Sequence, residues 1–213
     1  MSAPPPSSAA RIERGRAVTT FHLVRHAPHT LQESVLVGRM KGVALSDEGR
    51  AQAQALGARC RALRLDAIVA SPRRRARETA CAVAQACGLV VQVSPALDEV
   101  DFGAWTGAAL DALDADPRWR DWNARRATAR CPGGESMIDV WTRLDGLMRD
   151  LHARFPHGAV ALVSHAEPIR AAVLRAREMS FDDFLSVAVA PASVTTLVYE
   201  AGAMRLLDER AAA

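Results

Sequence analysis

The sequence contains very little lysine: Lys41 is the single one, so arginine supplies almost all of the 27 basic side chains. Arginine binds phosphate and carboxylate through a planar, forked set of donors, but this bias is weak evidence for an anionic ligand because GC-rich coding sequences share it. The net charge is only +3. No overall basic field of the kind that attracts nucleic acid is present, so we expect no nucleic-acid partner.

The chain also has few cysteines and no long apolar run. None of the cysteines forms a CxxC pair, which favours reduced thiols in a cytoplasmic protein: Cys60, Cys81, Cys87 and Cys131. No apolar run approaches about 18 residues, so we expect neither a transmembrane helix nor a membrane partner. Residues 1–17 lack the apolar segment of a secretory signal and begin rich in Pro, Ser and Ala, which predicts a disordered tail. The length of 18–213 suits a single domain.

Short apolar runs alternate with helical patterns along that domain. The runs that predict strands are 20–24, 66–72, 89–93, 159–165 and 193–199. The segments that predict helices are 46–63, 73–87, 136–155 and 168–176. This alternation predicts an α/β fold: a three-layer α/β/α sandwich with a mostly parallel sheet and helices on both faces.

The stretch 97–132 is less regular than the rest of the chain. It holds Trp105, Trp119 and Trp122, interrupted by glycine and proline. We expect a loop-rich insertion with short helices that forms a lid over a site. The tryptophans are expected to serve packing rather than ligand contact.

Polar side chains follow three of the predicted strands, at the point where each strand ends. Arg25 and His26 follow the first strand, Ser71 and a group of arginines follow the second, and Ser164 and His165 follow the fourth. Ligands of such sheets bind beyond the carboxyl ends of the strands. The sequence therefore predicts one site in which two histidines and at least two arginines meet.

These residue types suit phosphoryl transfer. A neutral imidazole is a nucleophile at physiological pH, and a histidine that attacks phosphorus divides one difficult step into two. Arginines stabilise the phosphoryl oxygens, and a carboxylic acid such as Glu99 can protonate the leaving oxygen. The alternative is a metal site formed by His22, His26 and His29. We expect no metal, because strand alternation turns His22 away and no carboxylate partner is evident.

Several blocks of the sequence resemble the histidine phosphatase superfamily, in particular its phosphoglycerate mutase-like branch. "LVRHA" (23–27) is similar to the L-x-R-H-G signature, "SPRRRARETA" (71–80) to S-P-x-x-R-A-x-x-T-A, and "LDEVDFGAWTG" (97–107) to L-x-E-x-x-x-G-x-W-x-G. "GRMKGVALSDEGRAQA" (38–53), "PGGES" (132–136) and "LVSHAEPIR" (162–170) complete the order of the blocks. The resemblance covers nearly everything except the N-terminal tail.

The resemblance implies a role for each matching residue. His26 would be the phosphorylated nucleophile, Arg25 and Arg75 would clamp the phosphoryl oxygens, His165 would complete the phosphate pocket, and Glu99 would be the general acid and base. The weaker candidates for phosphate or substrate contact are Arg39, Gln32, His29 and Ala166. No cofactor is implied. The resemblance selects Arg75 from its neighbours because it stands directly before the alanine of the block.

The chain departs from the family pattern beside both histidines. Ala27 and Ala166 stand where the family usually has glycine, and Pro28-His29 replaces a frequent Glu-Thr. Alanine keeps the backbone close to a phosphate provided that φ is negative. These changes are expected to alter substrate contacts more than the phosphoryl chemistry.

The function expected from the residues and the resemblance together is hydrolysis of small-molecule phosphomonoesters. Phosphoglycerate mutase is the first alternative, but such mutases tend to be longer after the second histidine than this chain is after His165. A non-catalytic phosphate-binding regulatory module is the second, although the full catalytic set is present. A phosphoprotein phosphatase fits less well, since a lid restricts access to a bulky chain. The sequence leaves the substrate open and does not decide whether the protein is a monomer or a homodimer.

Overall fold

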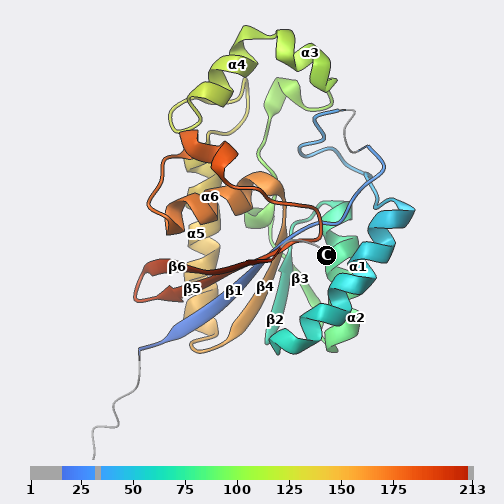
Figure 1. Cartoon of the computed structure of the whole chain (residues 1–213), viewed down its shortest axis with the longest axis vertical. Coiled ribbons are helices and arrows are strands. Elements are labelled where there is room, and N and C mark those ends of the chain that lie inside the picture. The colour runs from blue at the N-terminus through green and yellow to red at the C-terminus, as the bar shows by residue number, and fades with distance from the viewer. Residues whose placement is uncertain (1–15, 32–34, 211–213) are drawn as a thin grey trace, which may run out of the picture.

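The computed structural model describes residues 16–31 and 35–210 and contains one six-stranded sheet with helices on both faces (Figure 1). The strands are β1 (Val18–Arg25), β2 (Ala67–Ala70), β3 (Val91–Val93), β4 (Ala159–Ser164), β5 (Val194–Glu200) and β6 (Ala203–Arg210). Their order across the sheet is β3-β2-β4-β1-β5-β6. The first four are parallel neighbours, β5 is antiparallel to β1, and β6 is antiparallel to β5. The predicted α/β sandwich with a mostly parallel sheet is confirmed.

The helices cover the sheet in two groups. They are α1 (Asp47–Cys60), α2 (Arg74–Cys87), α3 (Leu110–Ala115), α4 (Pro117–Ala124), α5 (Met137–Arg154) and α6 (Ala166–Ala176). Alternating strand residues point to opposite faces, and this produces two cores. Leu162 of β4 packs in the core that includes α5 and α6, whereas its neighbour Val163 packs in the core that includes α1 and α2. The sheet is therefore buried on both sides, as a parallel sheet requires.

Local sequence explains where the helices begin. Ser46 accepts a hydrogen bond from Gly49 N at 3.0 Å and caps α1, and Asp47 and Glu48 lie in the first turn, where negative charge is favoured. Ser136 and Asp139 form a reciprocal capping box at the start of α5. These caps set the helix starts within one residue of the predicted positions.

The structure differs from the prediction at the edges of the sheet. β6 was not predicted, and β3 begins at Val91 rather than at residue 89. β6 follows β5 through a tight turn in which Ala201 and Gly202 have φ of 51° and 83°. Alanine is not a residue that favours positive φ, so the turn lacks the usual sequence signature of a hairpin. The charged residues in the sequence of β6 also interrupt the apolar alternation that would predict a strand.

The segment 97–132 contains α3 and α4, which lie together at one end of the molecule (Figure 1). Its tryptophan rings pack on one another: the Trp105 and Trp119 centroids are 5.2 Å apart, and those of Trp119 and Trp122 are 5.3 Å apart. Trp122 is buried in the same core as α5 and α6. The tryptophans therefore hold the segment together and attach it to the domain.

Within residues 16–31 and 35–210, no helix combines the length and apolar character that crossing a bilayer would require.

Candidate active site

The carboxyl ends of β1, β2 and β4 lie side by side. Arg25 pairs with Ser164 in the register of β1 and β4, and His26 N donates to Ser164 O at 3.0 Å. Ser71, which follows β2, donates its N–H to Val163 O at 2.9 Å. The predicted strand-end residues thus meet at one edge of the sheet.

The His26 ring is buried and its tautomer is determined by its neighbours. Nδ1 lies 2.8 Å from the carbonyl oxygen of Ala27, which can only accept, so Nδ1 carries the proton. Nε2 is then unprotonated and accepts from Arg75 Nε at 3.1 Å. Burial, followed by the positive charge of Arg75, holds the pKa of His26 well below its ordinary value. The ring is neutral at physiological pH, with its Nε2 lone pair directed into the cationic pocket.

Arg75 connects the two histidines. Its Nη2 donates to Gly38 O at 2.8 Å and to His165 Nδ1 at 2.9 Å. Its Nη1 is buried and has no hydrogen-bond partner among the described residues. A buried charged donor without a partner is unfavourable, which makes this atom a candidate contact for a ligand oxygen. Burial lowers the pKa of Arg75 to about 10, so it stays protonated at neutral pH.

A chain of hydrogen bonds orients His165. Because His165 Nδ1 accepts from Arg75, its Nε2 carries the proton and donates to Ser71 Oγ at 2.8 Å. The Ser71 hydroxyl donates to Asp98 Oδ1 at 3.2 Å, and Asp98 Oδ2 pairs with Arg73 at 2.9 Å. Ser71 was predicted from its place at a strand end, whereas Asp98 was not predicted. The one available signal was its position beside Glu99.

A second residue that sequence reasoning missed, Thr79, fixes the backbone after the nucleophile. Its Oγ1 accepts from Ala27 N at 3.0 Å and donates to Arg75 O at 2.8 Å. Neither Ala27 nor Ala166 is among the residues with positive φ. Alanine therefore replaces the expected glycines here without backbone strain.

Glu99 is a buried carboxyl group at the start of the 97–132 segment. Burial, and then the negative charge of Glu167, raises the pKa of Glu99 to about 7. A hydrogen bond from Val100 N at 3.0 Å and the charges of Arg75 and Arg25 act in the opposite direction. A carboxyl group with this pKa can both give and take a proton near neutral pH.

The weaker candidates lie in different places. Arg39 donates to Glu99 O at 2.8 Å and pairs with Glu135 at 2.9 Å, and its Nε lies 3.8 Å from Asp98 Oδ2. Its guanidinium is thus held by carboxylates and a carbonyl oxygen around Glu99. The His29 ring lies 5.3 Å from the His26 ring, and burial with nearby arginines lowers its pKa to about 4. Ala166 is the first residue of α6. Gln32 lies outside the described residues.

Arg25 and His22 leave β1 in different directions. Arg25 Nη1 donates to Val189 O at 2.6 Å, and its Nε is buried without a partner among the described residues. His22 Nδ1 lies 3.0 Å from Thr196 Oγ1 on β5. His22 is therefore engaged by the sheet, away from the strand-end cluster.

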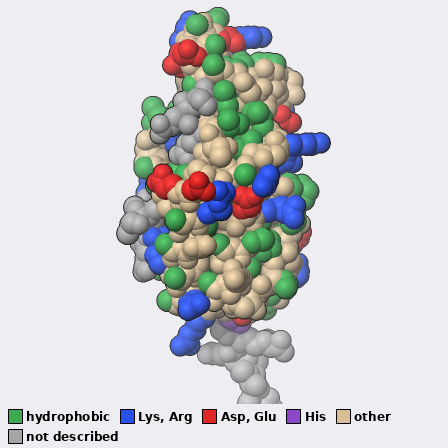
Figure 2. Space-filling model, turned by 90° about the vertical axis from the view of Figure 1, so that its right-hand side faces the viewer, with side chains coloured by type: hydrophobic (Ala, Val, Ile, Leu, Met, Phe, Trp, Pro, Cys, Tyr) green, Lys and Arg blue, Asp and Glu red, His purple; other side chains and the backbone are tan. Residues whose placement is uncertain are grey.

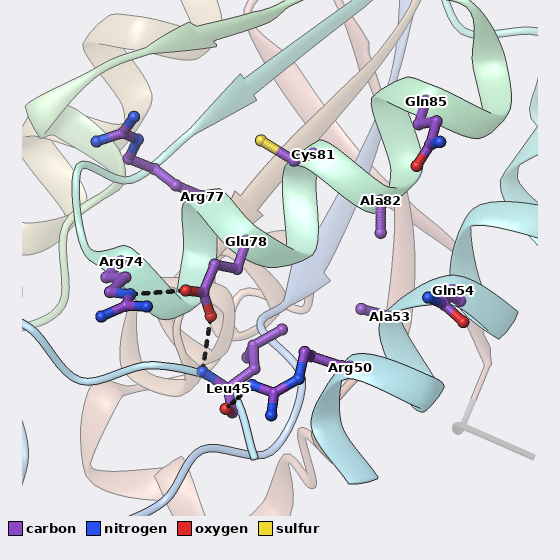
Figure 3. Close-up of a pocket in the computed structure, with 10 residues that line it drawn as sticks. All are labelled: Leu45, Arg50, Ala53, Gln54, Arg74, Arg77, Glu78, Cys81, Ala82 and Gln85. Carbon is purple, nitrogen blue, oxygen red and sulfur yellow. Dashed lines mark hydrogen bonds and ion pairs between the residues drawn. The ribbon is translucent and has the colours of Figure 1, made fainter. Parts of the chain in front are cut away.

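The outer face of α2 forms a separate hollow with α1 (Figure 3). Arg74, Arg77, Glu78 and Cys81 line it, and Arg74 pairs with Glu78 at 2.7 Å. The hollow contains none of the predicted catalytic residues, because Arg75 points from α2 to the opposite side. Of the neighbouring arginines, Arg75 is thus the one that reaches the histidines.

Charge on the molecular surface is mixed. On the face shown in Figure 2, arginine and acidic side chains are interspersed among the described residues rather than gathered in one broad basic patch. Several of the exposed arginines have carboxylate partners close in sequence, such as Arg125 with Asp121 at 2.6 Å and Arg118 with Asp116 at 2.8 Å.

Comparisons with known proteins agree with this geometry. Residues 21–210 match the family profile of the histidine phosphatase superfamily (branch 1). The chain is 33% identical to phosphoserine phosphatase 1 of Hydrogenobacter thermophilus over 154 residues, 70% of this chain and 72% of that protein. It is 31% identical to an acid phosphatase of Mycobacterium tuberculosis over 177 residues, 80% of this chain and 83% of that protein.

A solved structure is similar over nearly the whole chain. A mycobacterial glucosyl-3-phosphoglycerate phosphatase, in complex with VO3, superposes with a TM-score of 0.80 and 30% identity. The match covers 93% of this chain and all of that one. The fold, the strand-end cluster and the sequence similarity agree, and the chain belongs to branch 1 of the histidine phosphatase superfamily.

Proposed function

We propose that this phosphatase hydrolyses phosphate monoesters of small metabolites through a covalent phosphohistidine on His26. The observation that carries the proposal is the buried, unprotonated Nε2 of His26, 3.1 Å from Arg75 Nε. A neutral imidazole held in a cationic pocket is suited to attack an anionic phosphoryl group. Arginines supply the positive charge, so the chemistry needs no metal ion.

The phosphoryl group binds between the two arginines in this proposal. Arg75 Nη1 and Arg25 Nε are buried donors without partners among the described residues, and phosphoryl oxygens would satisfy both. The His165 ring, 5.1 Å from that of His26, completes the wall of the pocket and orients Arg75. Positioning and charge stabilisation are the main contributions a protein makes to phosphoryl transfer.

Glu99 serves both chemical steps. In the first, His26 Nε2 bonds to phosphorus while the ester oxygen leaves with the proton of the Glu99 carboxyl group. In the second, the Glu99 carboxylate takes a proton from water, the hydroxide attacks phosphorus, and the N–P bond breaks to release inorganic phosphate. The pKa of about 7 suits a group that alternates between acid and base.

The 97–132 segment acts as a lid in this proposal. Glu99 lies at its start, and α3 and α4 stand together at one end of the molecule (Figure 1). A segment in this position limits the substrate to a small ester and reduces access of bulk water. We also propose a cytoplasmic location, which the four free cysteines support.

The proposal is tested with His26→Ala. Hydrolysis of an aryl phosphate should fall to background, and rapid acid-free quenching with labelled substrate should trap a phosphoenzyme in the parent protein but not in the variant. His29→Ala, in the same loop, is the matched control and should still form the phosphoenzyme. Substantial turnover by His26→Ala would contradict the assignment of the nucleophile.

The substrate class is narrowed by a second experiment. Relatives of this chain are named for phosphoserine and glucosyl-3-phosphoglycerate, so the panel should include phosphorylated hydroxy acids beside sugar phosphates and nucleotide-derived phosphates. Release of inorganic phosphate and formation of a phosphate isomer are measured in parallel. Hydrolysis predicts the first product, and dominant isomer formation would favour the mutase alternative.

A further inference from the structure

A cluster of three charged side chains, two of them buried, lies one residue beyond the predicted site residue Ala166. Glu167, in the first turn of α6, accepts from Arg126 Nη1 at 2.5 Å and from Arg170 Nη1 at 2.7 Å. Glu167 is 7% exposed and Arg126 is 4% exposed. Buried ions of this kind are unfavourable unless they are paired, so the cluster requires an explanation beyond surface solvation.

Arg126 reaches this cluster from the 97–132 segment. Its guanidinium carbon lies 4.0 Å from the ring centroid of Trp122 and 3.5 Å from that of Phe184, so the group is held between two aromatic faces. Its Nη2 donates to Asn123 Oδ1 at 2.7 Å. The Arg126–Glu167 pair therefore connects the proposed lid to the helix that begins at the active site.

The cluster is also joined to the phosphate-binding side. Arg170 Nε donates to Val187 O at 3.0 Å, and Arg25 Nη1 donates to Val189 O at 2.6 Å. The two arginines thus lie against carbonyl groups two residues apart in one short segment. Glu167 pairs with Arg170, and the charges of both residues act on Arg25 at the phosphate-binding side.

The charges of Arg25 and Glu167 also act on Glu99. Ser164 Oγ donates to Leu97 O at 2.7 Å, which ties the strand end before α6 to the segment that carries Glu99. Cationic groups face Glu99 from several elements: Arg25 from β1 and Arg75 from α2, while Arg39 and Arg143 donate to its backbone oxygen. Asp98, its neighbour in sequence, is paired with Arg73. Two other carboxylates on this side are also paired, Asp101 with Arg39 and Glu135 with Arg143. The negative charge of Glu167 raises the pKa of Glu99.

We propose that Glu167 is a positioning residue for the general acid: through Arg126 it fixes on α6 the lid that carries Glu99, and through Arg170 its buried carboxylate is held toward the phosphate-binding side of the site. The inference rests on the proposed role of Glu99. It assigns to the Arg126–Glu167–Arg170 cluster an electrostatic function in addition to a structural one.

The test is the pH dependence of kcat/KM for an alkyl phosphate in Glu167→Gln. Loss of the carboxylate leaves two arginines uncompensated, and Glu99 should lose its proton at lower pH. We expect the alkaline limb of the kcat/KM profile to move to lower pH by about one unit. A shift of this size is what one charge at about 10 Å produces in a partly screened site. The profile for an aryl phosphate, whose leaving group needs no proton, should not move.

Two further variants separate electrostatics from structure. Asp182→Ala removes another contact of the lid, since Asp182 Oδ1 accepts from Ala127 N at 2.8 Å, and should leave the limb in place. Arg126→Met removes a positive charge beside Glu167 and should move the limb to higher pH, opposite to Glu167→Gln. This variant decides the question if Glu167→Gln does not fold.

Three results would overturn the proposal: an unmoved limb in Glu167→Gln, shifts of equal sign in Glu167→Gln and Arg126→Met, or a comparable shift in Asp182→Ala. Failure of the proposed function itself would look different. If Glu99 were not the acid, the parent enzyme would already show the same alkaline limb with alkyl and aryl esters.

Discussion

The phosphate-binding side of the site and its leaving-group side are organised in different ways. On the first side, Arg75 contacts His26 at 3.1 Å and His165 at 2.9 Å, and the bonds continue through Ser71 to Asp98. On the second side, the Glu99 carboxylate accepts from its neighbour Val100 N, and its protonation depends on burial and on charges that do not touch it. In the proposed mechanism, fixed hydrogen bonds define where the phosphoryl group binds, whereas the electrostatic environment defines when the proton moves.

The largest effect is expected from breaking the phosphate-binding side at Arg75. Arg75→Ala removes the donor to both histidines and the unpaired Nη1, and should lower kcat/KM by about 10²–10³-fold. The loss should be similar for alkyl and aryl esters, because both contain the same phosphoryl group. Arg77→Ala, on the outer face of the same helix, is the matched control and should stay within about twofold. An equal loss in Arg77→Ala would refute the distinction between the two faces of α2.

The loss of kcat/KM caused by a change on the leaving-group side should instead depend on the substrate. Glu99→Gln keeps the size of the side chain but cannot donate a proton, so kcat/KM for alkyl esters should fall by about 10²-fold or more. Aryl esters should lose much less, since their leaving groups depart as stable anions. Rates for a series of esters graded by leaving-group pKa measure the difference. Equal losses across the series would remove Glu99 from its proposed role.

The comparison is sharpened by the pH profile of the parent protein. Glu99 must be protonated to donate, so kcat/KM for alkyl esters should fall tenfold per pH unit above about 7. On the acid side, the lowered pKa of His26 keeps the nucleophile neutral well below pH 6.5. Aryl esters share the ionisation of the phosphate and serve as the internal control. An alkyl profile that stays flat above pH 8 would contradict the raised pKa.

The smallest effect is expected one contact away from the reacting atoms. Ser71→Ala removes the acceptor for His165 Nε2 and weakens the orientation of that ring. One hydrogen bond of this kind contributes about 1–1.5 kcal/mol, so kcat/KM should fall about tenfold for both ester classes. Ser94→Ala, which alters a helix cap elsewhere, provides a control for general effects on folding. A loss as large as that of Arg75→Ala would mean that Ser71 contacts the substrate.

Much of this site could be predicted from the sequence because the ends of apolar runs mark the ends of buried strands. Apolar runs end at His26, Ser71 and His165, and parallel strands bring their carboxyl ends to one edge. The choice of Arg75 among neighbouring arginines came from the resemblance, and the position of Arg75 opposite the α1–α2 hollow agrees with it.

The remaining contacts depend on packing between distant segments. Asp98 meets Ser71 across 27 positions, Thr79 meets Ala27 across 52, and Glu167 meets Arg126 across 41. None of these pairs has a local pattern in the sequence. Arg39, from the second block, stays a predicted phosphate or substrate contact; its ion pairs with Asp101 and Glu135 likewise join segments far apart in sequence.

The burial of Glu99 has a consequence for the folding stability of the whole domain. In the unfolded chain this carboxyl group ionises near pH 4.5, whereas in the folded protein it does so near 7. Between these values the folded state binds more protons than the unfolded state, so the free energy of unfolding declines as pH rises through this window and stays lower above it. Glu99→Gln should therefore melt at a higher temperature than the parent protein at pH 8, and the gap should shrink toward pH 5. The carboxyl group that we propose as the general acid thus also makes the fold less stable in alkaline solution.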